Sequence, residues 1–421
     1  MFDEKLRSET LAIHAGKFKS TTGSCATPIF QTASFLFENT EDAAAKFALK
    51  KDGNIYTRMG NPTNEVLEKR IAALEGGVAA VATTSGMSAI FLTIATLARA
   101  GDHIVASASL YGGTETLFRY TLSKFGIEVT FVENLNAENL KNAIQKNTRA
   151  IYFETIGNPK GDVLDFEKIS IAAHAESIPV IIDNTFAPII CRPFEFGANI
   201  VIHSSTKWIG GHGTSIGGVL VDGGNFNWNN NPEFTKPDES YGGIKFFEKF
   251  GANAFAVKAR VEGLRNLGMC SSPFNSWQIL QGAETLPLRI ERHSANTLAL
   301  AEWLERHERV EWVNYIGLPD HSSHALAKKY LRGGFGGVLS FGVHGGKPAG
   351  EKFINSVRLA SHLANVGDAK TLVIHPASTT HAQSSPEALA LAGVQPETIR
   401  VSVGLENIAD ICADFEQALS Q

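Results

Sequence analysis

The feature that most constrains the fold is an alternation of short apolar segments with helical patterns, which begins near residue 65. The apolar segments are rich in β-branched residues and are bounded by Gly, Asp and Asn. Such segments, separated by helices, are typical of a parallel sheet that is covered on both faces. Strands are predicted at Val78–Ala82, His103–Ala106, Glu128–Val132, Ala150–Phe153, Pro179–Ile182 and Asn199–His203, and helices at Asn64–Leu74, Gly86–Ala98, Thr114–Lys124, Ala137–Lys146 and Phe166–Glu176.

The alternation ends at the segment Asp222–Gly243, which is rich in Asn, Gly and Pro and is expected to be a long functional or mobile loop. After about Arg260 the helices become longer and the strands fewer, which predicts a second, smaller α/β domain. Its expected helices are Ser294–Glu308 and Lys352–Leu363, and its expected strands are Gly336–Val343 and Ile399–Val403.

The first 60 residues lack a regular pattern, and we interpret them as an arm that packs elsewhere on the molecule or on another subunit. The predicted organisation is therefore an arm over residues 1–64, a large domain over 65–262 and a small C-terminal domain over 263–421.

Composition excludes several other classes of protein. The chain has 421 residues, of which 43% are hydrophobic and 19% charged, so it is neither disordered nor fibrous. A net charge of −5 makes nucleic acid an unexpected partner. The four cysteines form no CxxC motif, and the charged segment Met1–Gly16 does not resemble a signal peptide. We expect reduced thiols and a cytoplasmic location.

The stretch Val78–Ala98 raises the question of a membrane span, because it has 21 residues without a charge. Its centre, Thr83-Thr84-Ser85-Gly86, has the residues that end a strand and cap a helix. We therefore expect a buried strand, a turn and a buried helix, and no contact with a membrane.

Polar residues follow the predicted strands at their carboxyl ends, where ligands of open α/β sheets bind. Because parallel strands end at the same edge of a sheet, we expect these residues to surround one rim. They are Ser85-Gly86-Met87, Tyr111-Gly112-Gly113, Glu154, Asp183 and Ser204-Ser205-Thr206-Lys207.

This set contains the parts of a pyridoxal-phosphate site. A lysine can form a Schiff base, a carboxylate can keep a pyridinium nitrogen protonated, and a helix N-terminus with small residues suits a phosphate. Each residue taken alone has a simpler interpretation: Ser85-Gly86 as a helix cap, Asp183 as a helix cap or surface residue, and Lys207 as a solvated side chain. Asp183 and Lys207 lie 24 positions apart (207 − 183), which is one βα unit, and this spacing on neighbouring strands favours the joint site.

Two other chemistries are disfavoured. A metal site would use the histidines, but these form neither HExxH nor a pair at i,i+4 spacing, and no nearby cysteine completes a zinc set. We predict no metal at His203, His212, His375 or His381. The chain also lacks the GxxxxGK[ST] loop that would give a lysine a Walker A role.

At these positions the chain resembles the Cys/Met-metabolism pyridoxal-phosphate enzymes, which have the aspartate-aminotransferase fold (fold type I). The resemblance extends over essentially the whole chain and implies a large, mostly parallel sheet domain with a smaller C-terminal α/β domain. The matching motifs are Tyr56-Thr57-Arg58-Met59-Gly60-Asn61-Pro62-Thr63, Thr84-Ser85-Gly86-Met87-Ser88-Ala89, Tyr111-Gly112-Gly113-Thr114, Glu154-Thr155-Ile156-Gly157-Asn158-Pro159, Asp183-Asn184-Thr185-Phe186, Ser204-Ser205-Thr206-Lys207, His375-Pro376-Ala377-Ser378 and Arg400-Val401-Ser402-Val403-Gly404-Leu405-Glu406.

The resemblance implies a role for each matching residue. Lys207 would hold pyridoxal 5'-phosphate and move protons, Asp183 would pair with the pyridine nitrogen, and Tyr111 would stack on the ring. Asn158 would bond the phenolic oxygen, and Arg400 would grip the substrate carboxylate, with Asn365 and Tyr56 also binding substrate. The phosphate ligands would be the backbone amides of Gly86 and Met87, the hydroxyls of Ser204 and Thr206, and Tyr56 and Arg58 from a neighbouring subunit.

Within the family, the chain is most similar to the O-acetylhomoserine sulfhydrylases. Three features carry this similarity: Asn365, where lyases usually have Ser; Gly113, where methionine γ-lyases typically have Cys; and the insertion Asp222–Gly243. The implied reaction joins O-acetylhomoserine and sulfide, or a small thiol, into homocysteine with loss of acetate, in a homotetramer built of catalytic dimers. A methionine or cystathionine γ-lyase, an O-succinylhomoserine sulfhydrylase and an inactive binding module are the alternatives.

Overall fold

The computed structural model describes residues 6–379 and 393–421, and its centre is a seven-stranded sheet with the strand order β1-β7-β6-β5-β4-β2-β3. Six strands point the same way, and β7 is antiparallel to both of its neighbours. The strands are β1 (Ala79–Thr83), β2 (His103–Ser107), β3 (Glu128–Val132), β4 (Thr148–Glu154), β5 (Val180–Asp183), β6 (Ile200–His203) and β7 (Gly218–Asp222). The predicted mostly parallel sheet is confirmed, although strand β7 was not predicted.

Helices cover both faces of this sheet, as its apolar strands predict. Along β5, Val180 and Ile182 pack into a core with α3 and α7, whereas Ile181 packs on the opposite face with α4 and α10. The helices of this part are α3 (Pro62–Glu75), α4 (Gly86–Leu97), α5 (Gly112–Thr116), α6 (Ala137–Ala143), α7 (Phe166–Ala175), α8 (Pro232–Thr235), α9 (Phe246–Phe250), α10 (Ala254–Lys258), α11 (Arg265–Leu267) and α12 (Pro273–Glu284). The uncharged stretch Val78–Ala98 forms β1 and α4, as expected.

The helix predicted at Thr114–Lys124 is not continuous. Helix α5 is followed by a π-helical turn over Leu117–Thr121 and a 3₁₀ turn over Leu122–Phe125. Gly126 ends the segment in the left-handed conformation, with φ of 73°. The change in helix type is a tertiary effect, because Phe118 and Leu122 are both buried in the core beside α4.

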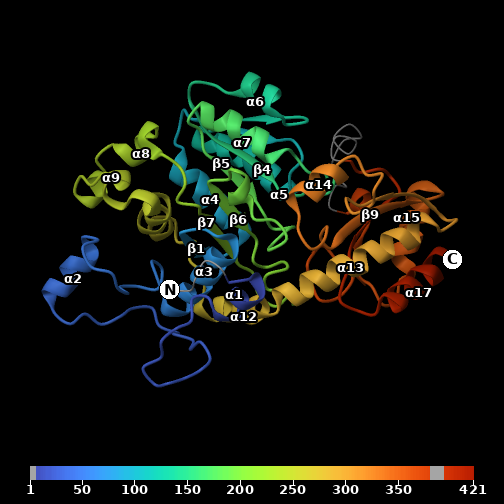
Figure 1. Cartoon of the computed structure of the whole chain (residues 1–421), viewed down its shortest axis with the longest axis horizontal. Coiled ribbons are helices and arrows are strands. Elements are labelled where there is room, and N and C mark those ends of the chain that lie inside the picture. Colours follow the sequence, from blue (N-terminus) through green and yellow to red (C-terminus); the bar gives the residue numbers. More distant parts are fainter. Residues whose placement is uncertain (1–5, 380–392) are drawn as a thin grey trace.

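The C-terminal part has a second sheet of five strands in the order β10-β11-β12-β9-β8. Helix α13 (Leu286–Glu305) runs from beneath the large sheet to this second sheet (Figure 1). The other elements are β8 (Val310–Asn314), α14 (His324–Tyr330), β9 (Val338–Val343), α15 (Gly346–Ser356), β10 (Ser361–His362), β11 (Leu372–Ile374), β12 (Thr398–Ser402) and α17 (Ile408–Leu419). His381 lies outside the described residues.

The helix predicted at Lys352–Leu363 is wrong in its second half. Helix α15 ends at Ser356, and Ser361–His362 form strand β10. The carboxylate of Asp414 on α17 accepts the backbone N–H groups of Arg358 and Ala360 at 2.7 and 3.0 Å. These bonds to another helix hold the chain in a non-helical path, which local helix propensity cannot reveal.

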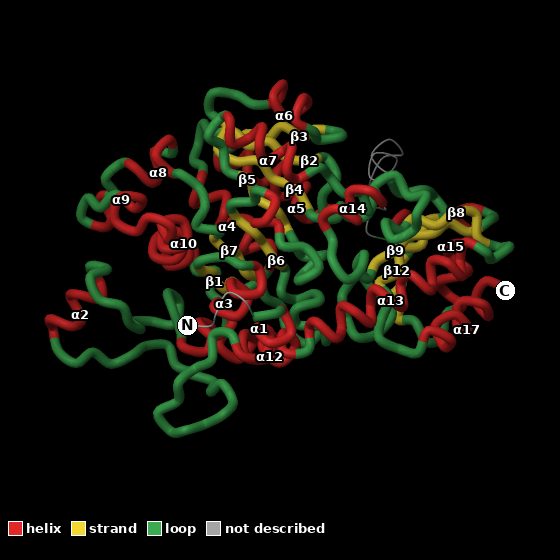
Figure 2. The backbone as a smooth tube through the Cα atoms, viewed as in Figure 1, coloured by secondary structure: helices red, strands yellow, loops and turns green. Residues whose placement is uncertain are grey.

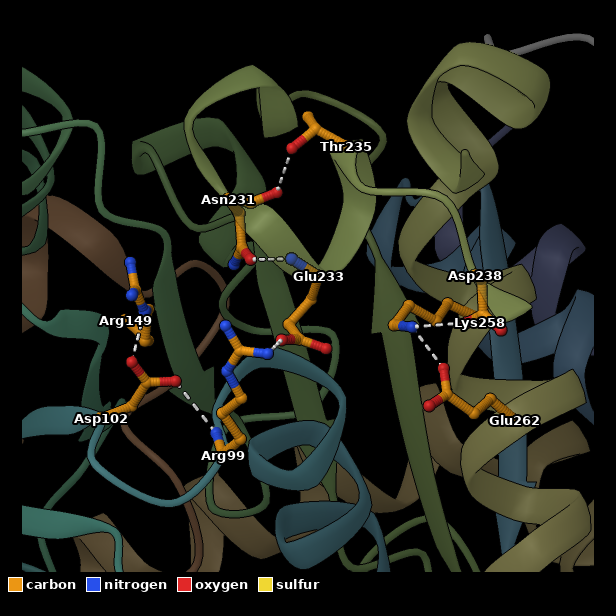
Figure 3. Close-up of polar contacts among 9 residues, drawn as sticks. All are labelled: Arg99, Asp102, Arg149, Asn231, Glu233, Thr235, Asp238, Lys258 and Glu262. Atoms are coloured by element: carbon orange, nitrogen blue, oxygen red, sulfur yellow. Dashed lines mark hydrogen bonds and ion pairs between the residues drawn. The ribbon is translucent and has the colours of Figure 1, made fainter. Parts of the chain in front are cut away.

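The segment Asp222–Gly243, for which composition predicted a long functional or mobile loop, contains short helical turns and packs into the core of the large sheet. It begins at the last residue of β7 and contains α8, and the buried ring of Trp228 stacks on Phe234 with 4.3 Å between centroids. Figure 3 shows its outer contacts, where Glu233 meets Arg99, and Asp238 and Glu262 flank the buried Lys258.

The first helix of the arm packs on the body of the molecule. Helix α1 (Ser8–His14) packs against α3, α12 and α13, and the carbonyl of Ala15 accepts a bond from Arg70 Nε at 3.0 Å. The following chain, with α2 (Thr40–Phe47), extends away from both sheets (Figures 1 and 2). Within the described residues, no helix has the length and apolar character needed to cross a membrane.

Candidate active site

The predicted rim forms where the parallel strands end. In the register of the large sheet, Glu154 and Asp183 are paired as the last residues of β4 and β5, and Ser204 directly follows β6. Tyr111 lies in the loop after β2, and its backbone N–H donates to Glu154 Oε1 at 2.7 Å. Adjacent parallel strands therefore bring these four residues together, as the sequence predicted.

Lys207 is joined at this rim by two residues of the C-terminal part, Asn365 between β10 and β11 and Arg400 on β12. Its Nζ donates to Asn365 Oδ1 at 2.5 Å. Arg400, on β12, donates from Nη1 to Asn158 Oδ1 at 3.3 Å and from Nη2 to the Asn365 carbonyl at 3.5 Å. The two sheets thus assemble one polar cluster of Lys207, Asn365, Arg400 and Asn158.

The cluster changes the proton affinity of its lysine. Burial lowers the pKa of Lys207 to about 8, and the positive charge of Arg400 acts in the same direction. Burial also lowers the pKa of Arg400, to about 10. A lysine with such a pKa has a sizeable fraction of neutral amine near neutral pH, and the neutral amine is the form that acts as a nucleophile or base.

Asp183 is a half-buried carboxyl that accepts hydrogen bonds from two neighbouring residues. Its Oδ1 accepts the N–H of Thr185 at 2.9 Å, and its Oδ2 accepts the hydroxyl of Tyr152 at 3.3 Å. Burial raises the pKa of Asp183, against the opposing effects of Thr185 and of nearby His203. A cation placed beside Asp183 would offset the cost of its buried charge.

The start of α4 has the geometry of a phosphate site. Ser85 caps the helix through its side chain, which accepts the N–H of Ser88 at 3.1 Å, so the amides of Gly86 and Met87 lie in the first turn, where N–H groups lack intrahelical partners. A Cβ on Gly86 would come within 2.7 Å of Ser204 Cβ, so only glycine lets the helix start approach the end of β6. Thr206 Oγ1 bonds to the carbonyl of Gly217 at 3.1 Å within the chain.

Tyr56 and Arg58 are not brought to the rim within this chain. Tyr56 is 41% exposed, and the Arg58 guanidinium lies 5.3 Å from its ring centroid and donates to the carbonyl of Arg265. These two residues lie on the exposed part of the arm, and their assignment to the site of a neighbouring subunit stays a prediction.

Three residues at the site had no assigned role in the sequence reading. Tyr152 and Thr185 bond Asp183, and Glu154 bonds the backbone of Tyr111. Thr185 had a local signal, because Asp-x-Thr favours a turn in which the carboxylate accepts the N–H two residues on. Glu154 was predicted at the rim as the polar residue that ends its strand, but Tyr152 had no signal, because inside a buried strand it reads as an ordinary member of the alternation.

These residues fit pyridoxal 5'-phosphate. Lys207 has a depressed pKa, Asp183 is a half-buried carboxyl suited to a cationic ring nitrogen, and the start of α4 offers free N–H groups beside Ser204. In the part of the chain that the structure describes, no group of three or more His, Cys, Asp and Glu side chains could hold a metal ion. The fold and the rim together define a fold type I enzyme that uses this cofactor.

Comparison with known proteins identifies the family. The model of the Cys/Met metabolism PLP-dependent enzymes matches residues 9–420, and the chain belongs to this family. It is 54% identical to the O-acetyl-L-homoserine sulfhydrylase of Leptospira meyeri, over 98% of this chain and 96% of that protein. It is 52% identical to the homocysteine synthase of Schizosaccharomyces pombe, over 98% and 97% of the two chains.

Solved structures give the same result. The crystal structure of a putative O-acetylhomoserine (thiol)-lyase from Campylobacter jejuni superposes with a TM-score of 0.96 at 40% identity, covering 99% of this chain and 100% of that one, and contains N'-pyridoxyl-lysine-5'-monophosphate at its position 205. The metB protein of Corynebacterium glutamicum superposes with a TM-score of 0.85 at 32% identity, covering 100% and 99% of the two chains.

Proposed function

We propose that this chain uses pyridoxal 5'-phosphate to convert O-acetyl-L-homoserine and sulfide, or a small thiol, into L-homocysteine and acetate in methionine biosynthesis. The observation that carries the proposal is the 2.5 Å bond between Lys207 Nζ and Asn365 Oδ1, because Asn365 marks the similarity to sulfhydrylases and here contacts the central lysine directly. The names of the relatives from Leptospira meyeri and Schizosaccharomyces pombe support the same reaction.

The residues of the rim have separate roles in the proposed reaction. When bound, the cofactor supplies an electron-accepting ring next to the substrate Cα. Lys207 would hold the cofactor covalently before substrate binds, and once the substrate amine has taken its place the free Lys207 amine would remove the Cα proton and return it. Arg400 binds the substrate carboxylate, while the Asn365 amide fixes the position of the Lys207 amine.

The remaining roles concern placement of the cofactor. Asp183 would keep the ring nitrogen protonated, Tyr111 would stack on the ring and Asn158 would bond its phenolic oxygen. The amides of Gly86 and Met87 bind the phosphate. The hydroxyls of Ser204 and Thr206 complete this phosphate site, for which Thr206 exchanges its bond to Gly217.

The exposed arm supports an assembly in which subunits share sites. We propose that Tyr56 and Arg58 reach the phosphate and substrate of a neighbouring subunit, in a cytoplasmic homotetramer built of catalytic dimers. The proposed parts of each subunit are the arm (1–64), the large domain (65–262) and the small domain (263–421). The large sheet lies within the second range and the five-stranded sheet within the third, which supports this division.

The test is a product assay on the purified, cofactor-loaded chain. O-acetylhomoserine and O-succinylhomoserine are supplied with and without sulfide, and methionine and cystathionine are supplied alone. We expect sulfide-dependent homocysteine from the acetyl ester. Formation of 2-oxobutanoate from methionine or cystathionine, without homocysteine from sulfide, would assign the chain to the γ-lyases and contradict the proposal.

A further inference from the structure

Helix α13, which runs between the two sheets (Figure 1), has a row of buried polar residues on one face. Arg289, His293 and Asn296 stand at positions i, i+4 and i+7, a spacing that places them on the same side of an α-helix. Each side chain is at most 6% exposed. Because a buried polar group is costly unless it is hydrogen-bonded, the partners of this polar row indicate its role.

Arg289 holds the turn that directly follows Lys207. Its Nη1 donates to the carbonyl of Trp208 at 2.7 Å, and its Nη2 donates to the carbonyl of Ile209 at 3.2 Å. The same Nη2 also donates to the carbonyl of Gly282 on α12 at 2.6 Å. One side chain of α13 therefore fixes the backbone of the two residues after the central lysine.

The charge of Arg289 indicates that this contact serves position more than stability. Its bonds go to carbonyls and to the Thr285 hydroxyl, and burial lowers the pKa of Arg289 to about 10 with no opposing acidic group among the described residues. An apolar side chain would avoid the cost of this unpaired buried charge. A Cβ on Gly211 would lie 2.1 Å from Nη1, so the turn closes tightly on the guanidinium.

The other two residues of the polar row hold the chain that follows Arg400. The carbonyl of Val403, directly after β12, accepts a bond from His293 Nδ1 at 2.6 Å. Burial lowers the pKa of His293 to about 4, so the ring is neutral and its N–H is on Nδ1. Asn296 Nδ2 donates to two further carbonyls within the next three residues, both at 2.9 Å.

We propose that α13 is a rigid spacer that sets the separation between the Lys207 amine and the Arg400 guanidinium. Arg289 is the positioning residue for Lys207, and His293 and Asn296 are the positioning residues for Arg400. All three act through the backbone of the chain that they hold. This inference rests on the proposed function, because it takes Lys207 to hold the cofactor and Arg400 to bind the substrate carboxylate.

The helix supplies the rigidity that a spacer needs. It is continuous over Leu286–Glu305 and contains no glycine, and Arg289 and Asn296 are about 10 Å apart along its axis. At the rim, the Asn365 amide oxygen accepts a bond from the lysine and the Asn365 carbonyl accepts one from the arginine of β12. One residue can bond both side chains only while their separation is kept.

The experiment uses variants of the full chain that break one end of the spacer at a time. Arg289→Met removes the donors at the Lys207 end, and Asn296→Leu removes those at the Arg400 end. Thr297→Val is the matched control, because Thr297 is fully buried on the same helix and its hydroxyl donates to a carbonyl of that helix.

Two measurements report the two ends separately. The rate at which pyridoxal 5'-phosphate attaches to the cofactor-free chain reports the position of Lys207. The preference of the loaded chain for L-norvaline over butylamine, which is the same molecule without its carboxylate, reports the grip of Arg400. Visible absorbance follows both reactions, and the thermal midpoint of each variant is recorded as the measure of stability.

We expect Arg289→Met to slow cofactor attachment by about tenfold and to keep the preference for L-norvaline, whereas Asn296→Leu should lower that preference by about tenfold and keep the attachment rate, each being the size of one lost buried contact. Thr297→Val should lower the thermal midpoint and leave both measurements close to wild type. If Arg289→Met does not fold, Arg289→Lys, which keeps the charge and one donor group, should slow attachment by a smaller factor.

Two results would overturn the proposal. In the first, the end variants lower the thermal midpoint but match Thr297→Val in both measurements, which would make the polar row purely structural. In the second, each end variant impairs both measurements equally, which would show a general loosening of the site.

Neither measurement requires turnover, so this inference and the proposed function can fail separately. If the wild-type chain forms no homocysteine but the two variants each impair their own end, the reaction is wrong and the spacer stands. If the wild-type chain is active and the variants do not separate the two ends, the spacer is wrong.

Discussion

The rim of the large sheet and the N-terminal arm both carry residues assigned to the site, yet they differ in how these are held. At the rim, Lys207, Asn365, Arg400 and Asn158 are partly or fully buried and linked by hydrogen bonds. On the arm, Tyr56 is 41% exposed and Leu36 is 97% exposed. The rim residues are thus linked to one another within the chain, whereas the arm leaves Leu36, Tyr56 and Arg58 exposed.

Removing the lysine of the rim should have the largest effect. Lys207→Ala should lower turnover by about 10³-fold or more and abolish the visible absorbance of the covalently held cofactor, because no other amine in the cluster replaces it. The arm should be unaffected, so the variant should assemble as wild type does. Turnover within tenfold of wild type would refute the role of Lys207.

The arm should act on the other subunit. Arg58→Ala alone should lower turnover by about 10²-fold, as expected for loss of a phosphate clamp. Mixing unfolded Arg58→Ala and Lys207→Ala chains and refolding them together should restore about a quarter of wild-type activity, because half of the dimers pair the two variants and each such dimer has one complete site. No recovery on mixing, with normal assembly, would place Arg58 in the site of its own chain.

The rim should also show its low lysine pKa in the cofactor-free chain. Below about pH 8 the Lys207 amine is protonated, so the rate of cofactor attachment should rise about tenfold per pH unit up to that pH and then level off. Arg400→Leu should move the midpoint upward, because it removes a neighbouring positive charge, whereas exposed Arg306→Leu should not move it. Stopped-flow absorbance measures the pH midpoint of cofactor attachment in each variant. A wild-type midpoint near pH 10.5 would contradict the lowering of the Lys207 pKa by burial.

The same pKa shift predicts a sign for stability. The folded pKa of Lys207 is about 8 and the ordinary value is 10.5, so between these values the unfolded chain binds more protons than the folded one. The free energy of unfolding of the cofactor-free chain should therefore gain from Lys207 as pH rises through this window. Lys207→Met should lack this contribution, which urea titrations at several pH values would detect.

The smallest effect should come from the apolar surface of the arm. Leu36→Asp should weaken association of the subunits by about tenfold or more, because it places a charge where an apolar contact is expected, and it should leave the unfolding of the isolated chain unchanged. Ile171→Asp, at a 70% exposed position on α7, is the control. Sedimentation velocity over a dilution series measures the subunit association of both variants. Equal association of the two variants would contradict a special role for the apolar surface of the arm.

The fold was predictable where the residues of one short segment are enough to specify its secondary structure. The apolar run Val180–Ile182 and the helix start at Ser85-Gly86 are found where the pattern placed them. Strand β7 was not predicted, although Val219–Val221 is an apolar run like those of the parallel strands, and the end of α15 was misplaced because Asp414 on a distant helix decides it.

For the site, the sequence by itself determined which chemical groups stand at the carboxyl edge of the large sheet, because parallel strands and their terminal residues are local features. That Asn365 lies 2.5 Å from Lys207 across 158 positions of sequence, and that Glu154 accepts the backbone N–H of Tyr111, follows only from the tertiary packing. The physical reason is that such contacts depend on how two sheets and their loops pack, and packing joins residues whose separation along the chain carries no periodic signal.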